Sequence, residues 1–448
     1  MVGPSPDASR RPWGCLGCAG VVVVAFLALV GLSAWDRWRG PSEIVDDTVE
    51  FAADEDPTRA PAGGRRGKGS DTYDDGADWP LYGRNQQRTR YMPFTGRTSI
   101  RPPFRERWGM TSSVLLEFPP ILCGRRLYVL RNDARLVAFH RRSGRKAWTR
   151  RVGRLAASSP ACAKGRLFVT ILERGRGTKG LVAAYSTGGR RLWQRRLASR
   201  TESSPLLAGD KLIFGTEGGD VLAMSPRTGR VLWRYRAGAP VKAAVARRDG
   251  LLYVGDYDGR MHAFTLSKGR RRWVTNLGAG RLYSTPAVAY GRVYVGGVGG
   301  AVVAVGARSG RVAWRRRADG YVYSAPAVAP VAGRGPTVFI GSYGGKLYAL
   351  DARTGRPRWI RDVGGRISGG VTVIGDLVMY ANRGQKTVGI RHARDGRRIY
   401  GFRSGGYDPG ISDGRRLYLV SFTSVYHLTP RAQARRDDRS LRQARRRR

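Results

Sequence analysis

Short apolar runs separated by glycine-containing turns recur along most of the chain. The clearest unit is residues 204–238, SPLLAGDKLIFGTEGGDVLAMSPRTGRVLWRYRAG, which contains four such runs. Brief runs of apolar and β-branched residues bounded by glycine are typical of short antiparallel strands joined by tight turns. The unit therefore predicts a four-stranded antiparallel sheet.

The second run of this unit recurs eight times as an apolar triplet. The triplets lie at residues 127–129, 167–169, 212–214, 252–254, 293–295, 338–340, 377–379 and 417–419. Self-similarity with a period of about 40 residues is the signature of a repeat architecture. Eight second strands predict eight blades. The expected fold is all-β, an eight-bladed β-propeller of four-stranded antiparallel blades over residues 78–430.

Tryptophan recurs with the same period, in the fourth run of each unit. The residues are Trp108, Trp148, Trp193, Trp233, Trp273, Trp314 and Trp359, and Tyr400 takes the next position. From Trp148 onward a glycine precedes each aromatic residue by four positions, as expected for a tight turn that needs a positive φ. We expect these tryptophans to be structural and to pack between adjacent blades.

Two irregularities at the ends of the array match each other. The last repeat runs through residues 425–428 and has no fourth strand, whereas FRERWGM around Trp108 is a fourth strand without a blade of its own. We expect this N-terminal strand to complete the last blade. Closure of this kind removes an open sheet edge.

The repeats resemble the quinoprotein (PQQ-like) repeat family. Residues 349–359, ALDARTGRPRW, follow that family's A-x-D-x-x-T-G-x-x-x-W pattern, and DWPLYG at residues 78–83, with Thr89 further on, is similar to its usual lead-in. The resemblance implies a propeller. It leaves function open, because the family includes quinone-dependent dehydrogenases, sensor domains of membrane kinases and the propeller subunit of the outer-membrane β-barrel assembly machine. The chain is closest in kind to the non-enzymatic members.

The N-terminus predicts a membrane anchor. Residues 16–34 carry no charge and are long enough to span a bilayer as a helix, with Trp13, Trp35 and Trp38 at its ends. A cleaved signal peptide and a lipoprotein signal fit less well, because Leu32-Ser33-Ala34 is a poor cleavage site and Cys15 and Cys18 precede the apolar run. We expect a cytoplasmic segment 1–15, a single-pass transmembrane signal anchor 16–35 and an extracytoplasmic propeller.

Composition adds two charged segments. The formal net charge is +48, from 81 Lys and Arg against 33 Asp and Glu. Residues 41–80 contain 11 acids and 4 bases and little apolar content, which predicts a disordered acidic linker over 36–77 that is able to fold back onto the basic domain. Residues 431–448 predict a disordered basic tail. The excess of arginine reflects either a basic proteome or a surface for polyanions.

Cysteine and histidine give no catalytic pattern. Cys123 and Cys162 occupy similar positions in neighbouring repeats; they are able to pair, but two buried thiols are the favoured interpretation. The histidines are spread over different blades without metal-ligand spacing. A quinone dehydrogenase would need carboxylates for calcium and usually an adjacent Cys-Cys pair; the central loops offer only Glu202 and Asp408, and the pair is missing. We expect no enzyme activity, no metal and no cofactor.

The remaining candidate is a binding surface. Loops that enter the first strand of each blade should converge at one end of the ring. They carry cations and tyrosines, which suit an anionic or acidic ligand: Arg154, Arg200, Lys242, Arg281, Tyr321, Tyr323, Arg366 and Tyr407. We expect a non-catalytic binding or scaffold module for envelope proteins or an anionic polymer or lipid, with a PQQ-dependent dehydrogenase as the alternative. The exported topology argues against nucleic acid.

Overall fold

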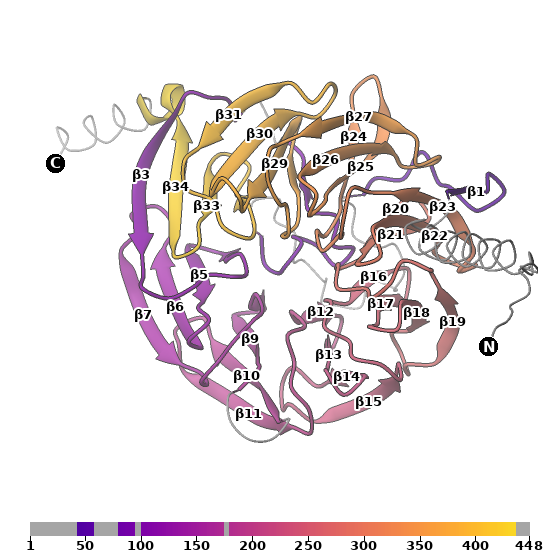
Figure 1. Cartoon of the computed structure of the whole chain (residues 1–448). Coiled ribbons are helices and arrows are strands. Elements are labelled where there is room, and N and C mark those ends of the chain that lie inside the picture. The colour runs from indigo at the N-terminus through magenta and orange to yellow at the C-terminus, as the bar shows by residue number, and fades with distance from the viewer. Residues whose placement is uncertain (1–42, 58–78, 95–99, 174–178, 436–448) are drawn as a thin grey trace, which may run out of the picture.

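Each repeat forms one antiparallel sheet in the computed structural model, which describes residues 43–57, 79–94, 100–173 and 179–435. Within these residues eight sheets stand side by side in a ring (Figure 1). The first strands of neighbouring blades contact one another, so they line the centre of the ring, and the fourth strands form its outer rim. The predicted eight-bladed propeller is confirmed.

The strands of each blade follow one another from the centre of the ring outward. Blades one to four comprise β4 (Ile121–Cys123), β5 (Arg126–Leu130), β6 (Arg135–His140), β7 (Lys146–Arg151); β8 (Ala161–Ala163), β9 (Arg166–Ile171), β10 (Gly180–Ser186), β11 (Arg191–Leu197); β12 (Leu206–Ala208), β13 (Lys211–Gly215), β14 (Asp220–Met224), β15 (Val231–Arg236); and β16 (Ala246–Arg248), β17 (Leu251–Gly255), β18 (Arg260–Thr265), β19 (Arg271–Asn276). Blades five to eight comprise β20 (Ala287–Ala289), β21 (Arg292–Gly297), β22 (Ala301–Gly306), β23 (Val312–Arg317); β24 (Ala327–Val331), β25 (Gly335–Gly341), β26 (Lys346–Asp351), β27 (Pro357–Asp362); β28 (Thr372–Ile374), β29 (Leu377–Asn382), β30 (Thr387–His392), β31 (Arg398–Phe402); and β32 (Gly410–Ser412), β33 (Leu417–Val420), β34 (Ser424–Pro430), β3 (Phe104–Thr111).

The apolar triplets are continuous because the second strands are covered on both faces. In β13 every residue after Lys211 is buried, and β17 has the same pattern. Each blade packs between two neighbours, so both faces of its inner strands need apolar side chains. The fourth strands lie on the rim and are more exposed to solvent, as in β15, where Tyr235 is the buried residue.

The ring closes as predicted from the missing fourth strand of the last repeat and the surplus strand around Trp108. β3 pairs antiparallel with β34, from Phe104 opposite Pro430 to Thr111 opposite Ser424 (Figure 1). Trp108 then lies against the first blade, where its Nε1 donates to the Arg141 carbonyl at 3.2 Å. One N-terminal strand therefore completes the eighth blade and joins it to the first.

All seven tryptophans lie between blades in the same way. Each Nε1 donates to a backbone carbonyl in the turn between the third and fourth strands of the next blade, at distances from 2.9 to 3.2 Å. Each ring also covers the glycine of that turn. A Cβ on Gly355, whose φ is +68°, would come within 2.6 Å of the Trp314 ring. The glycine four residues before each tryptophan from Trp148 onward therefore lies under the tryptophan ring of the preceding blade and not under that of its own blade.

His427 is buried in the closing blade, and we predict that it makes the protein acid-sensitive. Its ring stacks on Tyr418 at 5.0 Å, and burial, with smaller effects of Arg416 and Arg107, lowers its pKa to about 3. The unfolded chain takes up this proton near pH 6.5, so stability should fall as the pH drops from 6.5 toward 3. At pH 5 the loss from this group is about 2 kcal/mol. Urea unfolding at pH 7 and pH 5 measures it.

The matched variants for this prediction are His427→Phe and His140→Gln, since His140 is exposed. His427→Phe should lose less stability between pH 7 and pH 5 than the wild type, whereas His140→Gln should behave like the wild type. An unchanged pH dependence in His427→Phe would contradict the assignment.

Cys123 and Cys162 form a disulfide, so the favoured interpretation of two free thiols is wrong. Cys123 ends β4 and Cys162 is the middle residue of β8, the equivalent first strand of blade two. Their Cα atoms lie 6.3 Å apart, within the range that a disulfide spans. The bond links two blades near the centre of the ring.

The disordered-linker prediction is wrong for residues 43–57, which we call the strap. In the strap, β1 (Ile44–Val45) pairs antiparallel with β23 at the rim of blade five (Figure 1). The strap continues inward, where Val49 is buried and the Asn85 side chain donates to the Pro57 carbonyl. The acidic segment folds back onto the basic ring because arginines of blades four and five hold its carboxylates.

The remaining terminal predictions fall mostly outside the described residues. The anchor 16–35 lies outside them, and among the described residues no helix is long and apolar enough to cross a bilayer. Of the basic tail, residues 431–435 are helical, with Ala434 buried, so these five residues are ordered.

Candidate functional site

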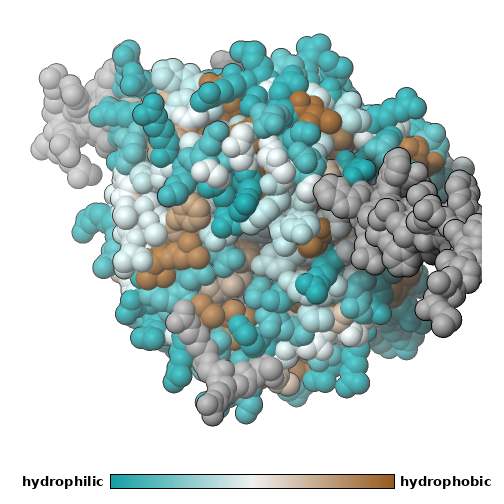
Figure 2. Space-filling model, viewed as in Figure 1, coloured by the Kyte–Doolittle hydropathy of each residue, from teal (hydrophilic) through white to brown (hydrophobic). Residues whose placement is uncertain are grey.

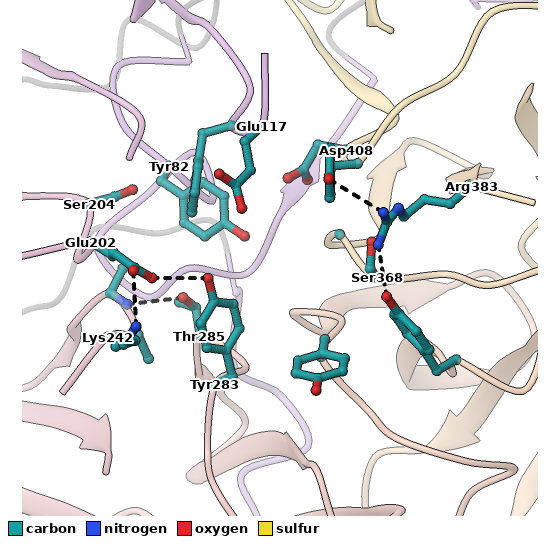
Figure 3. Close-up of a pocket in the computed structure, with 17 residues that line it drawn as sticks. Tyr82, Glu117, Glu202, Ser204, Lys242, Tyr283, Thr285, Ser368, Arg383 and Asp408 are labelled. Carbon is teal, nitrogen blue, oxygen red and sulfur yellow. Dashed lines mark hydrogen bonds and ion pairs between the residues drawn. The ribbon is translucent and has the colours of Figure 1, made fainter. Parts of the chain in front are cut away.

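One end of the ring carries a cavity of about 230 Å³ over its centre. We call this end the loop face. It is formed by the loops that enter the first strands and by the turns between second and third strands. The cavity is lined mainly by aromatic and charged side chains (Figure 3): Tyr82, Glu117, Phe118, Glu202, Lys242, Tyr283, Tyr323, Tyr343, Arg383, Tyr407 and Asp408.

The floor of the cavity comes from residues 79–92, which fill the central channel. Their carbonyls accept hydrogen bonds from first strands all around the ring, for example Gln86 from Arg247 at 2.7 Å and Thr89 from Val328 at 2.9 Å. Tyr82 of this segment lines the cavity. The lead-in motif is therefore the central plug of the propeller.

Two arginines of this plug are fully buried. Arg88 donates to backbone carbonyls, including that of Val245 at 3.0 Å, and burial lowers its pKa to about 9. Arg90 lies with its guanidinium 4.9 Å from the centre of the Tyr82 ring and forms an ion pair with Asp408. Burial raises the pKa of Asp408, and the charge of Arg90 opposes that shift. Asp408 is thus committed to neutralising a buried cation.

Glu202 is held on the opposite wall. Its carboxylate pairs with Lys242 at 3.0 Å and accepts a hydrogen bond from the Tyr283 hydroxyl at 3.3 Å (Figure 3). Burial raises the pKa of Glu202, whereas Lys242 lowers it. Lys242 also pairs with Glu217 at 3.2 Å and lies 5.6 Å from the Tyr257 ring centre. The wall is a network of opposite charges packed on tyrosine.

Arg383 has a similar setting across the cavity. Its guanidinium lies 4.3 Å from the centre of the Tyr407 ring and donates to the Tyr343 hydroxyl at 2.8 Å (Figure 3). Glu117, the remaining acid of the lining, accepts a hydrogen bond from Asn132 at 3.1 Å. Each carboxylate of the cavity therefore already has a partner.

The structure brings together three of the eight predicted binding residues, Lys242, Tyr323 and Tyr407, in the cavity wall. Four others surround it. Arg281 lies 6.0 Å from the Tyr257 ring, Arg366 lies 5.5 Å from the Tyr343 ring, Tyr321 contacts Tyr323, and Arg200 pairs with Glu217 at 3.8 Å. Arg154 is exposed and does not line the cavity.

Several lining residues were not predicted. Tyr283 precedes Ser-Thr-Pro as Tyr323 precedes Ser-Ala-Pro, so aligning the repeats RLYSTPAVA and YVYSAPAVA would have found it. Tyr343 and Arg383 come from turns between second and third strands, which the prediction did not include. Tyr82 and Glu117 belong to the N-terminal segments before the first blade.

The donor set does not fit calcium and a quinone. Among the described residues, no three His, Cys, Asp or Glu side chains gather closely enough to hold a metal ion. The cavity acids are spread over separate walls and engaged by Lys242, Arg90 and Asn132. Calcium needs six or more oxygen ligands, many of them from carboxylates. The disulfide joins β4 to β8 and does not line the cavity.

Relatives of two kinds match parts of the chain. Outer membrane protein assembly factor BamB of Yersinia pestis is 30% identical over 114 residues, 25% of this chain and 29% of that protein. Quinohemoprotein alcohol dehydrogenase ADH-IIG of Pseudomonas putida is 36% identical over 117 residues, 21% of this chain and 16% of that protein. The chain thus spans less than a third of the length of these relatives.

Solved structures of both kinds share the fold. BamB from Moraxella catarrhalis superposes with a TM-score of 0.59 at 17% identity, covering 73% of this chain and 98% of that one. The ADHIIG structure from Pseudomonas putida gives a TM-score of 0.65 at 13% identity, covering 79% and 80%. A family model described as outer membrane protein assembly factor BamB matches residues 105–244 and 236–436. These matches extend over nearly all of the ring, and the chain belongs to this BamB-like family of β-propellers.

Proposed function

We propose that this protein is a non-catalytic binding and scaffold propeller that holds an acidic partner, a protein or an anionic envelope component, on its loop face. In this proposal residues 16–35 anchor it in the cell membrane and the ring lies on the extracytoplasmic side. The BamB relatives are named for outer-membrane protein assembly, which agrees with a scaffold role.

The observation that carries the proposal is how the charges of the loop face are distributed. Each acid of the cavity has a partner: Asp408 pairs with Arg90, Glu202 pairs with Lys242, and Glu117 accepts a hydrogen bond from Asn132. This arrangement supports a binding surface over a metal site. Exposed cations, Arg281 and Arg366, lie beside tyrosine rings around the cavity on the loop face. Exposed guanidinium groups next to aromatic rings bind carboxylate, phosphate or sulfate groups through charge-assisted hydrogen bonds.

The net positive charge of the chain supports an acidic partner but does not indicate which surface binds that partner. Figure 2 shows that hydrophilic residues cover most of one face, with hydrophobic residues in small separate patches. A chain of net charge +48 attracts polyanions at many places. A test must therefore separate the loop face from the rest of the surface.

Binding to dextran sulfate, with neutral dextran as the uncharged polymer, tests the proposal. We expect the wild type to bind dextran sulfate with an affinity that falls steeply between 50 and 200 mM salt, and not to bind dextran. Arg281→Ser/Arg366→Ser should weaken binding about five- to tenfold, since each exposed pair contributes up to about 1 kcal/mol. Fluorescence titration of the detergent-solubilised full chain measures this.

The matched control is Arg125→Ser/Arg227→Ser, which removes the same charge from exposed residues in turns at the opposite end of the ring. It should change the affinity less than twofold. Equal losses in the two double variants would contradict a binding site on the loop face. Dye reduction after addition of PQQ and calcium would contradict the non-catalytic part and favour the quinoprotein dehydrogenase alternative.

A further inference from the structure

The strap shows how the outer edge of a blade accepts an acidic extended segment. Ile44 lies opposite Arg315 and Val45 opposite Trp314, and the Asp46 amide donates to the Ala313 carbonyl at 2.6 Å. β1 therefore adds an outermost strand to blade five (Figure 1). Unpaired edge strands accept further strands in this manner.

Charge fixes the strap in place on this edge. Asp46 pairs with Arg311 at 2.8 Å and Glu43 with Arg316 at 2.5 Å. Glu50 accepts hydrogen bonds from the backbone of Arg308 and Ser309 at 2.9 and 3.0 Å. The ligand is thus an extended segment in which acids flank β-branched residues.

β15 of blade three repeats the sequence and register of the occupied strand. β23 reads VAWRRR and β15 reads VLWRYR. Trp314 lies opposite Ala304 and Trp233 opposite Ala223, and both strands bulge at the residue before the tryptophan, Ala313 and Leu232. Counting from the two tryptophans, Arg230 and Tyr235 stand where the strap-binding Arg311 and Arg316 stand in blade five. Arg234 and Arg236 stand where Arg315 and Arg317 stand.

The two strands differ in what covers them. Ala313 is 1% exposed and packs in one cluster with Val49 of the strap. The corresponding Leu232 is 41% exposed, and Val231 beside it is 48% exposed. Exposed large apolar residues on an unpaired edge are typical of an interaction site.

A groove of about 440 Å³ runs beside this edge, between blades three and four. Arg234, Arg236, Arg260 and Arg271 line it. Among the residues that the structure describes, Arg234 and Arg236 pair with one acid, Asp220, at 3.6 and 3.9 Å, and their side chains are 48% and 81% exposed. Such exposed pairs are weak, so both arginines remain available to an acidic ligand.

We propose that the outer edge of β15 is a docking site for an acidic extended segment of a partner protein, which adds to blade three as β1 adds to blade five. The strap of this chain is already engaged on blade five, through Val49, Glu50 and the β1 pairing, and the strap of a second copy is engaged in the same way. The occupant is therefore a different protein. The site lies on the rim and is separate from the loop face.

The probe for the test is a fluorescein-labelled peptide of residues 42–52, SEIVDDTVEFA, added to the detergent-solubilised full chain. We expect Arg234→Ser/Arg236→Ser to weaken binding at least fivefold. Arg150→Ser/Arg151→Ser, which removes two exposed arginines from β7 of blade one, should change it less than twofold. A peptide with its acids replaced by amides should bind at least fivefold more weakly, and so should one with proline at the Val45 position, which removes a ladder donor.

The place of binding is checked with a photo-crosslinker at the Ile44 position of the peptide. Adducts on β15 support the proposal. Adducts confined to β23, by exchange with the strap, would overturn it. Equal losses in the two arginine variants, or no effect of the proline, would also overturn it, because both indicate adhesion by charge alone. Binding of dextran sulfate at the loop face is a separate measurement. Its outcome tests the proposed function and does not depend on whether the peptide binds β15.

Discussion

Replacing Asp408 by alanine is expected to lower the free energy of unfolding by about 3–5 kcal/mol, since it leaves a buried charge without its partner. Arg90 is 1% exposed, and Asp408 is the acid that pairs with it. The Arg90 guanidinium also contacts the Val371 carbonyl at 2.7 Å, the Thr372 hydroxyl and the Tyr82 ring. These contacts offset only part of the cost of keeping a guanidinium out of water.

The double variant Arg90→Met/Asp408→Leu separates the charge effect from lost packing. Removing both members of a buried ion pair is often nearly neutral, so this variant should regain more than half of the lost stability. Urea unfolding of the three proteins measures the difference. A loss below about 1 kcal/mol in Asp408→Ala would mean that Arg90 is solvated, contrary to a plugged central channel.

Trp314→Ala is expected to cost about 3–5 kcal/mol, the range for removing a large aromatic side chain from a core. Trp314 is fully buried, its Nε1 donates to the Ala352 carbonyl at 3.0 Å, and its ring covers Gly355 of blade six. The substitution leaves a cavity between blades five and six and an unpaired carbonyl. Both effects act at one blade interface.

Trp148 supplies the matched control, because it makes the same hydrogen bond, to the Thr187 carbonyl at 3.1 Å, but is only half-buried. Trp148→Ala should cost about 1–2 kcal/mol, in proportion to the smaller apolar area that it buries. The comparison uses the midpoint and slope of urea unfolding. Similar losses at the two sites would show that burial between blades does not set the contribution of the tryptophans.

The blades were predictable because their signals are local. The apolar triplets, the turn glycines and the tryptophans recur in every unit, and each acts within its own blade or on the next one. Closure of the ring by the strand around Trp108 was also predictable. The last repeat lacks a fourth strand, and the chain has one surplus strand before the first repeat that can take its place. None of these inferences depends on knowing which distant residues meet.

The site was predictable only where repeats could be compared. Lys242, Tyr323 and Tyr407 lie in loops that the repeat pattern marks. Arg88 and Arg90 lie in RNQQRTR, a polar segment without periodicity, and their burial follows from docking in a channel that exists only after the ring has closed. The strap was predicted as part of a disordered linker able to fold back onto the basic domain. Its order was missed because low apolar content indicates disorder unless a basic surface elsewhere in the chain offers partners.

If the proposed anchor holds the chain in a membrane, the strap would also limit how far the propeller moves from it. On the proposed topology the span ends at residue 35 and the strap begins at Glu43, so seven residues, 36–42, separate them. Seven fully extended residues reach about 25 Å. A free linker to residue 77 would let the ring explore a wide volume, whereas on this topology the pairing of the strap with blade five would keep one side of the ring close to the bilayer. The β15 edge, two blades away, would then meet partners that are themselves held at that surface.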